Sequence, residues 1–236
     1  MEKSNLKELR LGIDDAGRGP VIGPMILGGC LIPEETETEF KELGITDSKL
    51  LYRKKREKLA KIIKEKSIVY YTHSISPAEI DTGMGIGLNL NEVEALAASI
   101  VIKELIKNIS KEELKNLSII IDCPSVNNDS WHKNVLEYLE NKDLNIRCEH
   151  KADLDHVVVA AASIIAKVTR DNEIEKLKKQ IGLDFGSGYP ADPKTKDFLK
   201  KHVNDFKDIH LFRESWATFQ KAKENFKLRQ SKLPDY

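Results

Sequence analysis

The order in which short apolar strands and amphipathic helices follow one another is the feature that most constrains the fold. Residues 9–13 and 25–32 predict two strands joined by a Gly/Pro turn, and therefore an antiparallel pair. Residues 67–75 predict a third strand, and the apolar runs at 117–124 and 144–150 predict two more. With helices between and after these strands, the chain predicts an α/β layer structure built on a mixed sheet.

Helical spacing of apolar residues appears in four segments. They are residues 46–66, which are rich in lysine, and residues 91–109, 130–141 and 157–180. The sequence DTGMGIGLN, at residues 81–89, predicts a turn cluster before the second of these helices.

A second break, GSGYPADP, follows the long helix and precedes a lysine-rich tail that predicts two or three short helices. We therefore expect a large domain over residues 1–190 and a helical region with a tail over residues 191–236.

Composition excludes several classes of protein. The chain has 38 basic and 38 acidic residues and a formal net charge of zero, so it is not a histone-like polycation, although local basic tracks are still compatible with this balance. The three cysteines, Cys30, Cys123 and Cys148, form no CxxC pair and predict buried thiols in a reducing compartment. The charged N-terminus and the absence of a long apolar run predict a cytoplasmic protein with no membrane contact.

Acidic residues stand at the ends of the predicted strands. Asp14 and Asp15 end the first strand, Asp122 ends the fourth, and Asp153 follows the fifth. Desolvated carboxylates raise one another's pKa, and a divalent cation relieves this repulsion; ligands that offer only oxygen favour Mg²⁺ or Mn²⁺. An aspartate at a strand end is also a common turn residue that bonds its own backbone. Spacing alone leaves both interpretations open.

The turn GRGPVIG follows the aspartate doublet directly. It lacks the Gly-Lys-Ser/Thr ending of a nucleotide phosphate loop, and a strand follows it where such a loop has a helix. Successive backbone amides in such a turn can still bind one phosphate or sugar hydroxyl, and Arg18 adds a planar fork of donors.

Seven motifs occur in one order over nearly the whole chain. They are GIDDAGRGPVIGP, TDSK, NLNEVEA, IIIDCP, KAD with AASIIAKVTRD, GSGYPADPKT and FRESWAT. This series resembles ribonuclease HII, the type 2 ribonuclease H family, and the tail resembles the archaeal branch of that family.

The resemblance implies a ribonuclease H-like fold, with a five-stranded mixed sheet flanked by helices in the catalytic domain and a C-terminal helical subdomain. It implies an endonuclease of DNA replication and repair that hydrolyses the RNA strand of RNA–DNA hybrids. Such an enzyme also cuts duplex DNA on the 5′ side of an embedded ribonucleotide and leaves a 3′-hydroxyl and a 5′-phosphate. Two Mg²⁺ or Mn²⁺ ions and a monomeric state are expected.

Matched position by position, the motifs imply a set of site residues. The catalytic metal ligands would be Asp14, Asp15, Asp122 and Asp153. The loop that contacts the 2′-hydroxyl would be Gly17, Arg18 and Gly19; Tyr189 would stack on the adjoining deoxyribose; and Ser48 and Lys49 would contact backbone phosphates.

The chain departs from the family pattern at two places. Asp15 replaces the usual glutamate and is one methylene shorter, which predicts a weaker second ion or a shift toward Mn²⁺. The alternative function is therefore a hybrid-binding protein with weak or Mn²⁺-only catalysis. Val157 stands where proline is frequent, and the neighbouring Asp155 and His156 are unusual; Asp155 is expected to be a helix N-cap. A ribonuclease HIII-like activity is a further alternative, but that family carries an N-terminal extension, whereas here the signature begins at residue 12.

The last residues, QSKLPDY, contain the spacing of a short sliding-clamp-binding peptide. Gln230, Leu233 and Tyr236 match the pattern Gln-x-x-hydrophobic-x-x-aromatic, although Pro234 would strain the helical turn in which such peptides dock.

Overall fold

The computed structural model describes residues 7–46, 48, 51–124 and 127–230. Its elements in chain order are β1 (Leu9–Ala16), β2 (Met25–Pro33), α1 (Thr36–Glu42), α2 (Arg53–Lys66), β3 (Val69–Ile75), α3 (Pro77–Gly85), α4 (Leu90–Ile106), α5 (Lys111–Leu114), β4 (Leu117–Asp122), α6 (Asn128–Glu137), β5 (Ile146–Glu149), α7 (Ala152–Asp155), α8 (Val157–Ile181), α9 (Pro193–His202), η2 (Lys207–Ile209) and α10 (Ala217–Gln230). Among these described residues, no helix is long and apolar enough to cross a membrane.

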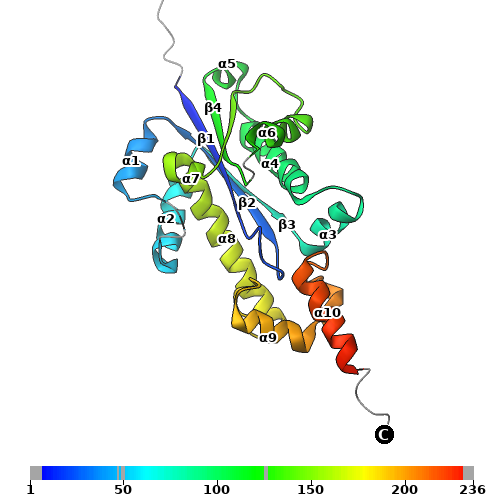
Figure 1. Ribbon diagram of the computed structural model, residues 1–236. Helices are drawn as coiled ribbons and strands as arrows, with labels where there is room; N and C mark the ends of the chain where they lie inside the picture. The colour runs from blue at the N-terminus through cyan, green and yellow to red at the C-terminus, as the bar shows by residue number, and fades with distance from the viewer. Residues whose placement is uncertain (1–6, 47, 49–50, 125–126, 231–236) are drawn as a thin grey trace, which may run out of the picture. The chain divides into compact units, whose positions relative to one another are not determined.

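The strands form one five-stranded sheet in the order β3-β2-β1-β4-β5 (Figure 1). β1 pairs antiparallel with β2 and parallel with β4, and β4 pairs parallel with β5. The predicted mixed sheet and the predicted antiparallel pair are therefore confirmed. Because β1, β4 and β5 run in the same direction, their C-terminal ends lie along one edge of the sheet, where polar sites of α/β proteins gather.

The chain divides into two compact units that alternate along the sequence. Unit 1 comprises Met1–Ala16, Ile26–Ser74 and Leu90–Arg170, and unit 2 comprises Gly17–Met25, Ile75–Asn89 and Asp171–Tyr236. Unit 1 contains nearly all of the sheet and the first part of α8, whereas unit 2 contains α3, α9, η2 and α10. The domain boundary that the sequence predicts between residues 190 and 191 stays a prediction.

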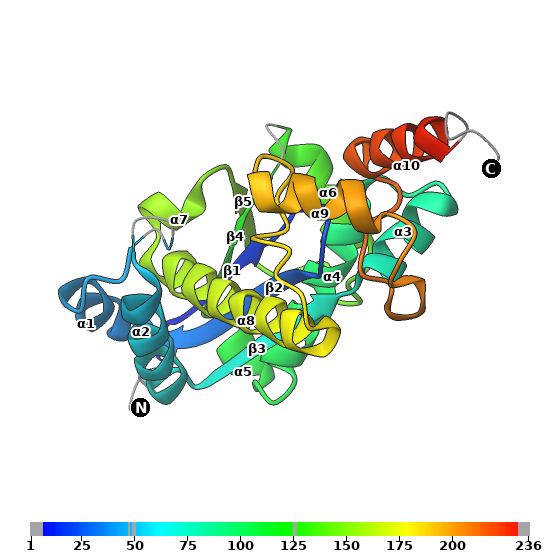
Figure 2. The ribbon, with the colours of Figure 1, turned by 90° about the horizontal axis from the view of Figure 1, so that it is seen from below.

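Glycines allow helices to lie unusually close to the central strands of unit 1. A Cβ at Gly12 would lie 2.3 Å from the Val158 carbonyl oxygen of α8, and a Cβ at Gly28 would lie 2.9 Å from the Ala162 oxygen. A Cβ at Gly29 would instead meet Leu105 of α4 at 2.7 Å. Successive residues of a strand point to opposite faces, so α8 covers one face of the sheet and α4 covers the other (Figure 2).

Aromatic rings form the centre of unit 2. Phe198 lies 5.7 Å from Phe185 and 6.2 Å from Phe212, between ring centroids, and Phe212 lies 5.4 Å from Phe219. These distances are typical of tilted aromatic pairs, and the four buried side chains join α9 and α10 to the glycine-rich segment before α9.

The predicted turn at residues 81–89 is wrong for most of its length, because α3 extends through Gly83 to Gly85. Local capping outweighs the glycine signals. Ser76 accepts a hydrogen bond from the Glu79 amide, the Glu79 carboxylate accepts one from the Ser76 amide, and Pro77 occupies the first turn.

The predicted long helix is confirmed as α8, but its start differs from the expectation. Asp155 is the last residue of α7 and not an N-cap of α8. His156 separates the two helices with extended backbone angles, φ −122° and ψ 110°, and α8 begins at Val157.

The thiols lie largely inside the fold. Cys30 and Cys123 are buried, Cys148 is partly buried, and all three are free. Burial raises the pKa of Cys30 to about 12, and burial together with Cys123 and Glu149 raises the pKa of Cys148 to about 12, so both thiols are protonated at neutral pH.

Replacing Gly12 by alanine should destabilise the protein by more than about 2 kcal/mol, because the new methyl group would meet the backbone of α8 and not a flexible side chain. Gly85 is the matched control, since a Cβ there meets nothing within 4 Å, and Gly85→Ala should change stability by less than about 1 kcal/mol. Urea unfolding of both variants measures the difference, and equal stability of the two would contradict the close packing of α8.

Candidate active site

Two of the predicted carboxylates point to the face of the sheet that α8 covers. Asp14 lies two positions after Gly12, whose face α8 covers, and Asp122 lies two positions after Ile120, which packs in the same core cluster as the start of α8. Side chains two residues apart on a strand share a face. The ends of the parallel strands β1 and β4 therefore bring Asp14 and Asp122 together, and the charge of Asp122 contributes to a raised pKa of Asp14.

Asp14 is buried, with 6% of its surface exposed. Burial, followed by the charges of Asp15 and Asp122, raises its pKa well above the usual value. Two hydrogen bonds oppose this shift: the Asp15 amide donates to Oδ1 at 2.7 Å, and the Ser163 hydroxyl of α8 contacts the carboxylate. An acid that is buried among like charges fits a site for a cation.

Asp153 reaches the same region through α7. The Ala152 amide, at the start of α7, donates to Asp122 Oδ1 at 2.7 Å, and Asp153 is the next residue. Asp153 is 6% exposed. Asp122 is therefore directly joined to the backbone of the helix that carries Asp153.

Asp15 differs from the other three carboxylates. It directly follows Asp14 in β1, so its side chain points to the opposite face of the sheet. Within the described part of the chain, no three His, Cys, Asp or Glu side chains converge closely enough to hold a metal ion as they stand. The donor set and the raised pKa of Asp14 fit a divalent cation, but coordination requires these side chains to turn toward one another.

Of the two predicted phosphate contacts, Ser48 and Lys49, the structure describes only Ser48. Ser48 is 3% exposed, and its hydroxyl lies 2.9 Å from the Ser163 hydroxyl, so the side chain faces inward. Its hydroxyl supports Ser163, which in turn contacts Asp14. A phosphate contact at Ser48 stays a prediction, and Lys49 lies outside the described residues.

The predicted loop at Gly17, Arg18 and Gly19 belongs to unit 2, where the buried Arg213 organises it. The Arg213 guanidinium donates to the Gly17 oxygen at 2.6 Å, the Arg18 oxygen at 2.8 Å and the Gly23 oxygen at 3.0 Å. Trp216 Nε1 donates to the Gly19 oxygen at 3.2 Å. Three successive carbonyl groups are thus fixed by side chains that lie almost 200 positions later in the sequence.

The orientation of these carbonyls also sets the direction of the amides. In a planar trans peptide, the C=O of one residue and the N–H of the next point in opposite directions. With the Gly17 and Arg18 carbonyls directed at Arg213, the N–H groups of Arg18 and Gly19 point to the other side of the loop. The φ of +89° at Gly17 is a conformation that favours glycine.

Tyr189 lies beside this loop. A Cβ built on Gly19 would be 3.7 Å from Tyr189 Cε1, and the Tyr189 side chain is 39% exposed. The Gly188 carbonyl accepts a hydrogen bond from the Val21 amide at 2.9 Å, which fixes the turn before Tyr189 against the loop. The structure therefore places an exposed aromatic ring next to the two oriented amides.

The hydrogen-bond contacts of Ser163, Arg213 and Trp216 were not predicted from the sequence. All three lie inside the motifs AASIIAKVTRD and FRESWAT, so the sequence marked their segments. It did not reveal which carboxylate or carbonyl each side chain contacts, because those partners are more than a hundred positions away.

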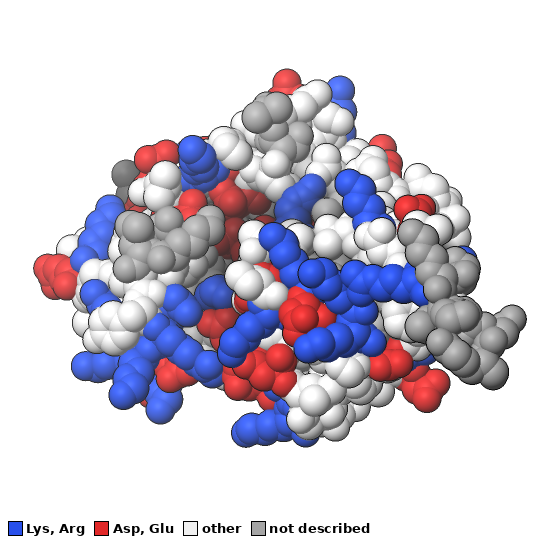
Figure 3. Space-filling model, turned by 60° about the horizontal axis from the view of Figure 1, so that its bottom comes forward, with Lys and Arg blue, Asp and Glu red and all other residues white. Residues whose placement is uncertain are grey.

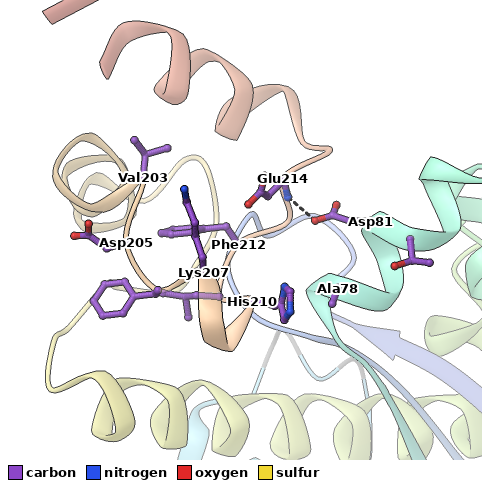
Figure 4. Close-up of a pocket in the computed structure, with 11 residues that line it drawn as sticks. Ala78, Asp81, Val203, Asp205, Lys207, His210, Phe212 and Glu214 are labelled. Carbon is purple, nitrogen blue, oxygen red and sulfur yellow. Dashed lines mark hydrogen bonds between the residues drawn. The ribbon is translucent and has the colours of Figure 1, made fainter. Parts of the chain in front are cut away.

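A cavity of about 390 Å³ lies within unit 2 between α3 and the segment after α9 (Figure 4). Asp81 at its edge accepts hydrogen bonds from the Glu214 amide at 2.7 Å and the Ser215 amide at 3.0 Å. None of its lining residues is a predicted site residue. Its polar edge joins α3 to the Arg213 segment, which gives it a structural role.

A smaller hollow of about 190 Å³ lies between α9 and α10. The charged residues that line it are all basic: Lys196, Lys200, Lys221 and Arg229. Figure 3 shows many Lys and Arg side chains at the surface, with Asp and Glu side chains among them. A basic hollow attracts polyanions in spite of a net charge of zero.

Comparisons with known proteins agree with this fold. The sequence pattern of the family described as Ribonuclease HII matches residues 11–219. A Ribonuclease HII of Methanococcus maripaludis (strain C6) is 47% identical over 213 residues, which cover 88% of this chain and 84% of that protein.

Solved structures give the same result. The crystal structure of ribonuclease H2 from Pyrococcus horikoshii OT3 has a TM-score of 0.80 and 37% identity, and covers 93% of this chain and 99% of that one. Ribonuclease HII of Archaeoglobus fulgidus, solved as a PCNA:RNase HII complex, has a TM-score of 0.69 and 36% identity over 81% of this chain and 85% of that one. Bst-RNase HIII in complex with Mn²⁺ has a TM-score of 0.78 at 24% identity, over 95% of this chain and 72% of that one, and is a likeness of fold.

These matches, together with the mixed sheet and the carboxylates at its edge, define a nuclease of the ribonuclease H-like fold class. The chain belongs to the ribonuclease HII family. It is a metal-dependent endoribonuclease, a hydrolase that degrades the RNA of RNA–DNA hybrids.

The raised pKa of Asp14 predicts an effect of pH on stability. The native state binds this proton more tightly than the unfolded state, so stability without metal should fall as pH rises through the raised pKa. Asp14→Asn should therefore be more stable than the parent protein in EDTA at neutral pH, and the gain should vanish below about pH 4, where both states are protonated. Thermal unfolding in EDTA between acid and neutral pH measures this.

Asp197 is the control for that series. A hydrogen bond from Lys201 lowers its pKa, so Asp197→Asn should bring no gain at neutral pH. Equal behaviour of the two variants would show that Asp14 is not an electrostatic cost to the fold.

Arg213→Lys should loosen the loop at residues 17–19, because an ammonium group cannot hold three separated carbonyls as the planar guanidinium does. We expect a loss of about 2–4 kcal/mol in stability and, well below the melting temperature, a loss of about 100-fold in kcat/KM. Trp216→Phe removes a single hydrogen bond and should cost about 1 kcal/mol. Unchanged kcat/KM in Arg213→Lys would rule out a role for the oriented amides.

Proposed function

We propose that this endoribonuclease cuts two kinds of substrate, the RNA strand of hybrids and duplex DNA on the 5′ side of a single embedded ribonucleotide. Hydrolysis would use two Mg²⁺ or Mn²⁺ ions and leave a 3′-hydroxyl and a 5′-phosphate. The observation that carries the proposal is the pair of oriented amides at Arg18 and Gly19 beside the exposed ring of Tyr189.

The loop suits recognition of one sugar. The 2′-hydroxyl is the group that distinguishes a ribonucleotide from a deoxyribonucleotide, and it can accept hydrogen bonds from backbone amides. Tyr189 offers a flat apolar face for the neighbouring deoxyribose. Because neither contact involves a base edge, we expect discrimination by sugar and little preference for base sequence.

The carboxylates suit the chemical step. Asp14, Asp15, Asp122 and Asp153 would hold the ions, and bound divalent ions would supply an activated water and neutralise charge on the phosphate. Asp14 is kept in place by Ser163 and the Asp15 amide, and Asp122 by the Ala152 amide. These bonds fix two carboxylates on the α8 side of the strands before substrate arrives.

Asp15 gives the second candidate function its physical basis. Its side chain points away from the face that Asp14 and Asp122 share, and it is about 1.5 Å shorter than a glutamate. A protein that binds hybrids and cuts them weakly, or cuts them only with Mn²⁺, fits this geometry. The two functions differ in whether the natural chain turns over with Mg²⁺.

Contacts to phosphates would strengthen binding without reading sequence. We propose Ser48, Lys49 and the four basic residues of the hollow between α9 and α10 as such contacts.

A sliding clamp is a proposed partner. The relative from Archaeoglobus fulgidus was solved with PCNA, and the C-terminal spacing of Gln230, Leu233 and Tyr236 supports the same kind of contact here. Gln230 is the last residue of α10, whereas Leu233 and Tyr236 lie outside the described residues. Clamp binding by the full chain and by a chain without residues 230–236 tests this proposal.

The decisive experiment is cleavage of a labelled DNA duplex that carries one ribonucleotide, with Mg²⁺ and with Mn²⁺ in parallel. We expect one cut on the 5′ side of the ribonucleotide, no cut in an all-DNA duplex, and loss of cleavage in Asp122→Asn. Asp15→Glu should raise the Mg²⁺-supported rate more than the Mn²⁺-supported rate. Mg²⁺ demands a stricter coordination geometry, and the longer side chain can place its carboxylate to meet it.

Each alternative outcome has a clear meaning. Tight binding without cleavage under either ion would identify a hybrid-binding protein. Cleavage that requires several consecutive ribonucleotides would identify the ribonuclease HIII-like activity. If Asp15→Glu does not raise the cleavage rate with Mg²⁺, the shorter side chain of Asp15 does not limit catalysis.

A further inference from the structure

One side-chain pair joins the two ends of the segment that carries Asp153. Glu149 is the last residue of β5, and His156 is the residue between α7 and α8. Glu149 Oε2 and His156 Nε2 lie 2.7 Å apart, across seven positions of sequence. The pair therefore closes a loop around α7, and Asp153 lies inside that loop.

This segment has little stability of its own. α7 has four residues, and a helix of that length does not persist without outside contacts. Lys151, just before it, has a φ of +60°, a left-handed conformation that costs a non-glycine residue about 1–2 kcal/mol. The position of Asp153 therefore depends on contacts that hold the ends of the segment.

His156 is suited to hold one end. Its amide donates to the Ala152 oxygen at 2.9 Å and completes α7, and its carbonyl accepts from the Val159 and Ala160 amides at 3.0 Å and begins α8. Its side chain returns to Glu149 and is about one-fifth exposed. Backbone and side chain of one residue thus connect β5, α7 and α8.

The position of Glu149 next to Asp122 is a second reason to fix its side chain. It is the register partner of Asp122 in the parallel pair of β4 and β5, so both side chains lie on the same face, about 5 Å apart at their backbones. Its carboxylate is engaged on both oxygens: Oε1 lies 3.5 Å from Arg147 Nη1, and Oε2 contacts His156. Released, it would be a further carboxylate within reach of a cation at Asp122.

We propose that Glu149 and His156 are positioning residues for metal binding, acting as a clip, which we call the 149–156 clip. The clip holds the segment that carries Asp153 beside Asp122, whose Oδ1 accepts a hydrogen bond from the Ala152 amide, and keeps the Glu149 carboxylate out of the ion site. This inference rests on the proposed use of Asp122 and Asp153 as metal ligands.

The test compares two substitutions at one position. His156→Ala removes the clip and should weaken Mn²⁺ binding, measured by calorimetry without substrate, by about 10-fold. His156→Gln keeps an N–H donor toward Glu149 and should stay within about 2-fold of the parent protein, since the hydrogen bond is preserved. In cleavage assays, His156→Ala should need more Mn²⁺ for half-maximal rate and regain most of its kcat at saturating Mn²⁺.

Control variants separate the clip from general effects. His202 and Asp205 form a similar pair at 2.8 Å in unit 2, and Asp205→Ala should leave Mn²⁺ binding unchanged. Arg147→Ala removes only the more exposed partner of Glu149. It should therefore weaken Mn²⁺ binding less than His156→Ala does. Melting in EDTA reports any loss of stability separately.

The outcomes are distinct. Wild-type Mn²⁺ affinity in His156→Ala, or equal losses in His156→Ala and His156→Gln, would overturn the clip. If the parent protein binds Mn²⁺ no more tightly than Asp122→Asn, the proposed metal ligands are themselves wrong and the clip falls with them. Weakened binding in His156→Ala alone, with a parent protein that binds Mn²⁺ through Asp122, supports the clip.

Discussion

The close packing of α8 on β1 and β2 is the constraint on which the rest of the structure depends. Gly12 and Gly28 leave room for the helix backbone at distances that no side chain would permit. This approach brings Ser163 against Asp14 and buries the carboxylate at the strand end. The same helix begins immediately after the segment that carries Asp153, so one packing contact governs the surroundings of two of the four acidic residues.

The carboxylate site carries an electrostatic cost that the remainder of unit 1 must offset. Asp14 is desolvated and lies near two like charges, an arrangement that opposes folding in the absence of a cation. The hydrophobic core around α8, with many residues fully buried, supplies the compensating stability. Residues that lower the stability of the fold are typical of functional sites, because they are kept for binding and not for folding.

The sequence predicted those parts of the structure whose causes are local. Apolar runs located the strands, and the motif around Asp14 and Gly17 pointed to the family to which the chain belongs, because turn chemistry and burial are written in neighbouring residues. The prediction of a turn was wrong at α3, because two local signals conflict there and the capping by Ser76 and Glu79 outweighs the glycines. The contacts of Arg213, Ser163 and His156 were beyond prediction, since each depends on where a distant or separately folded segment comes to lie.

The alternation of the two units along the chain has a consequence for synthesis on the ribosome. The loop at Gly17 leaves the ribosome early, but the arginine that fixes its carbonyls is 196 positions later. The strands of unit 1 and α8 are complete by residue 181, well before Arg213 is made. A nascent chain can therefore assemble its acidic edge while the carbonyls of residues 17–19 still lack the side chains that fix them. The loop at residues 17–19 is thus fixed only when the protein is almost finished.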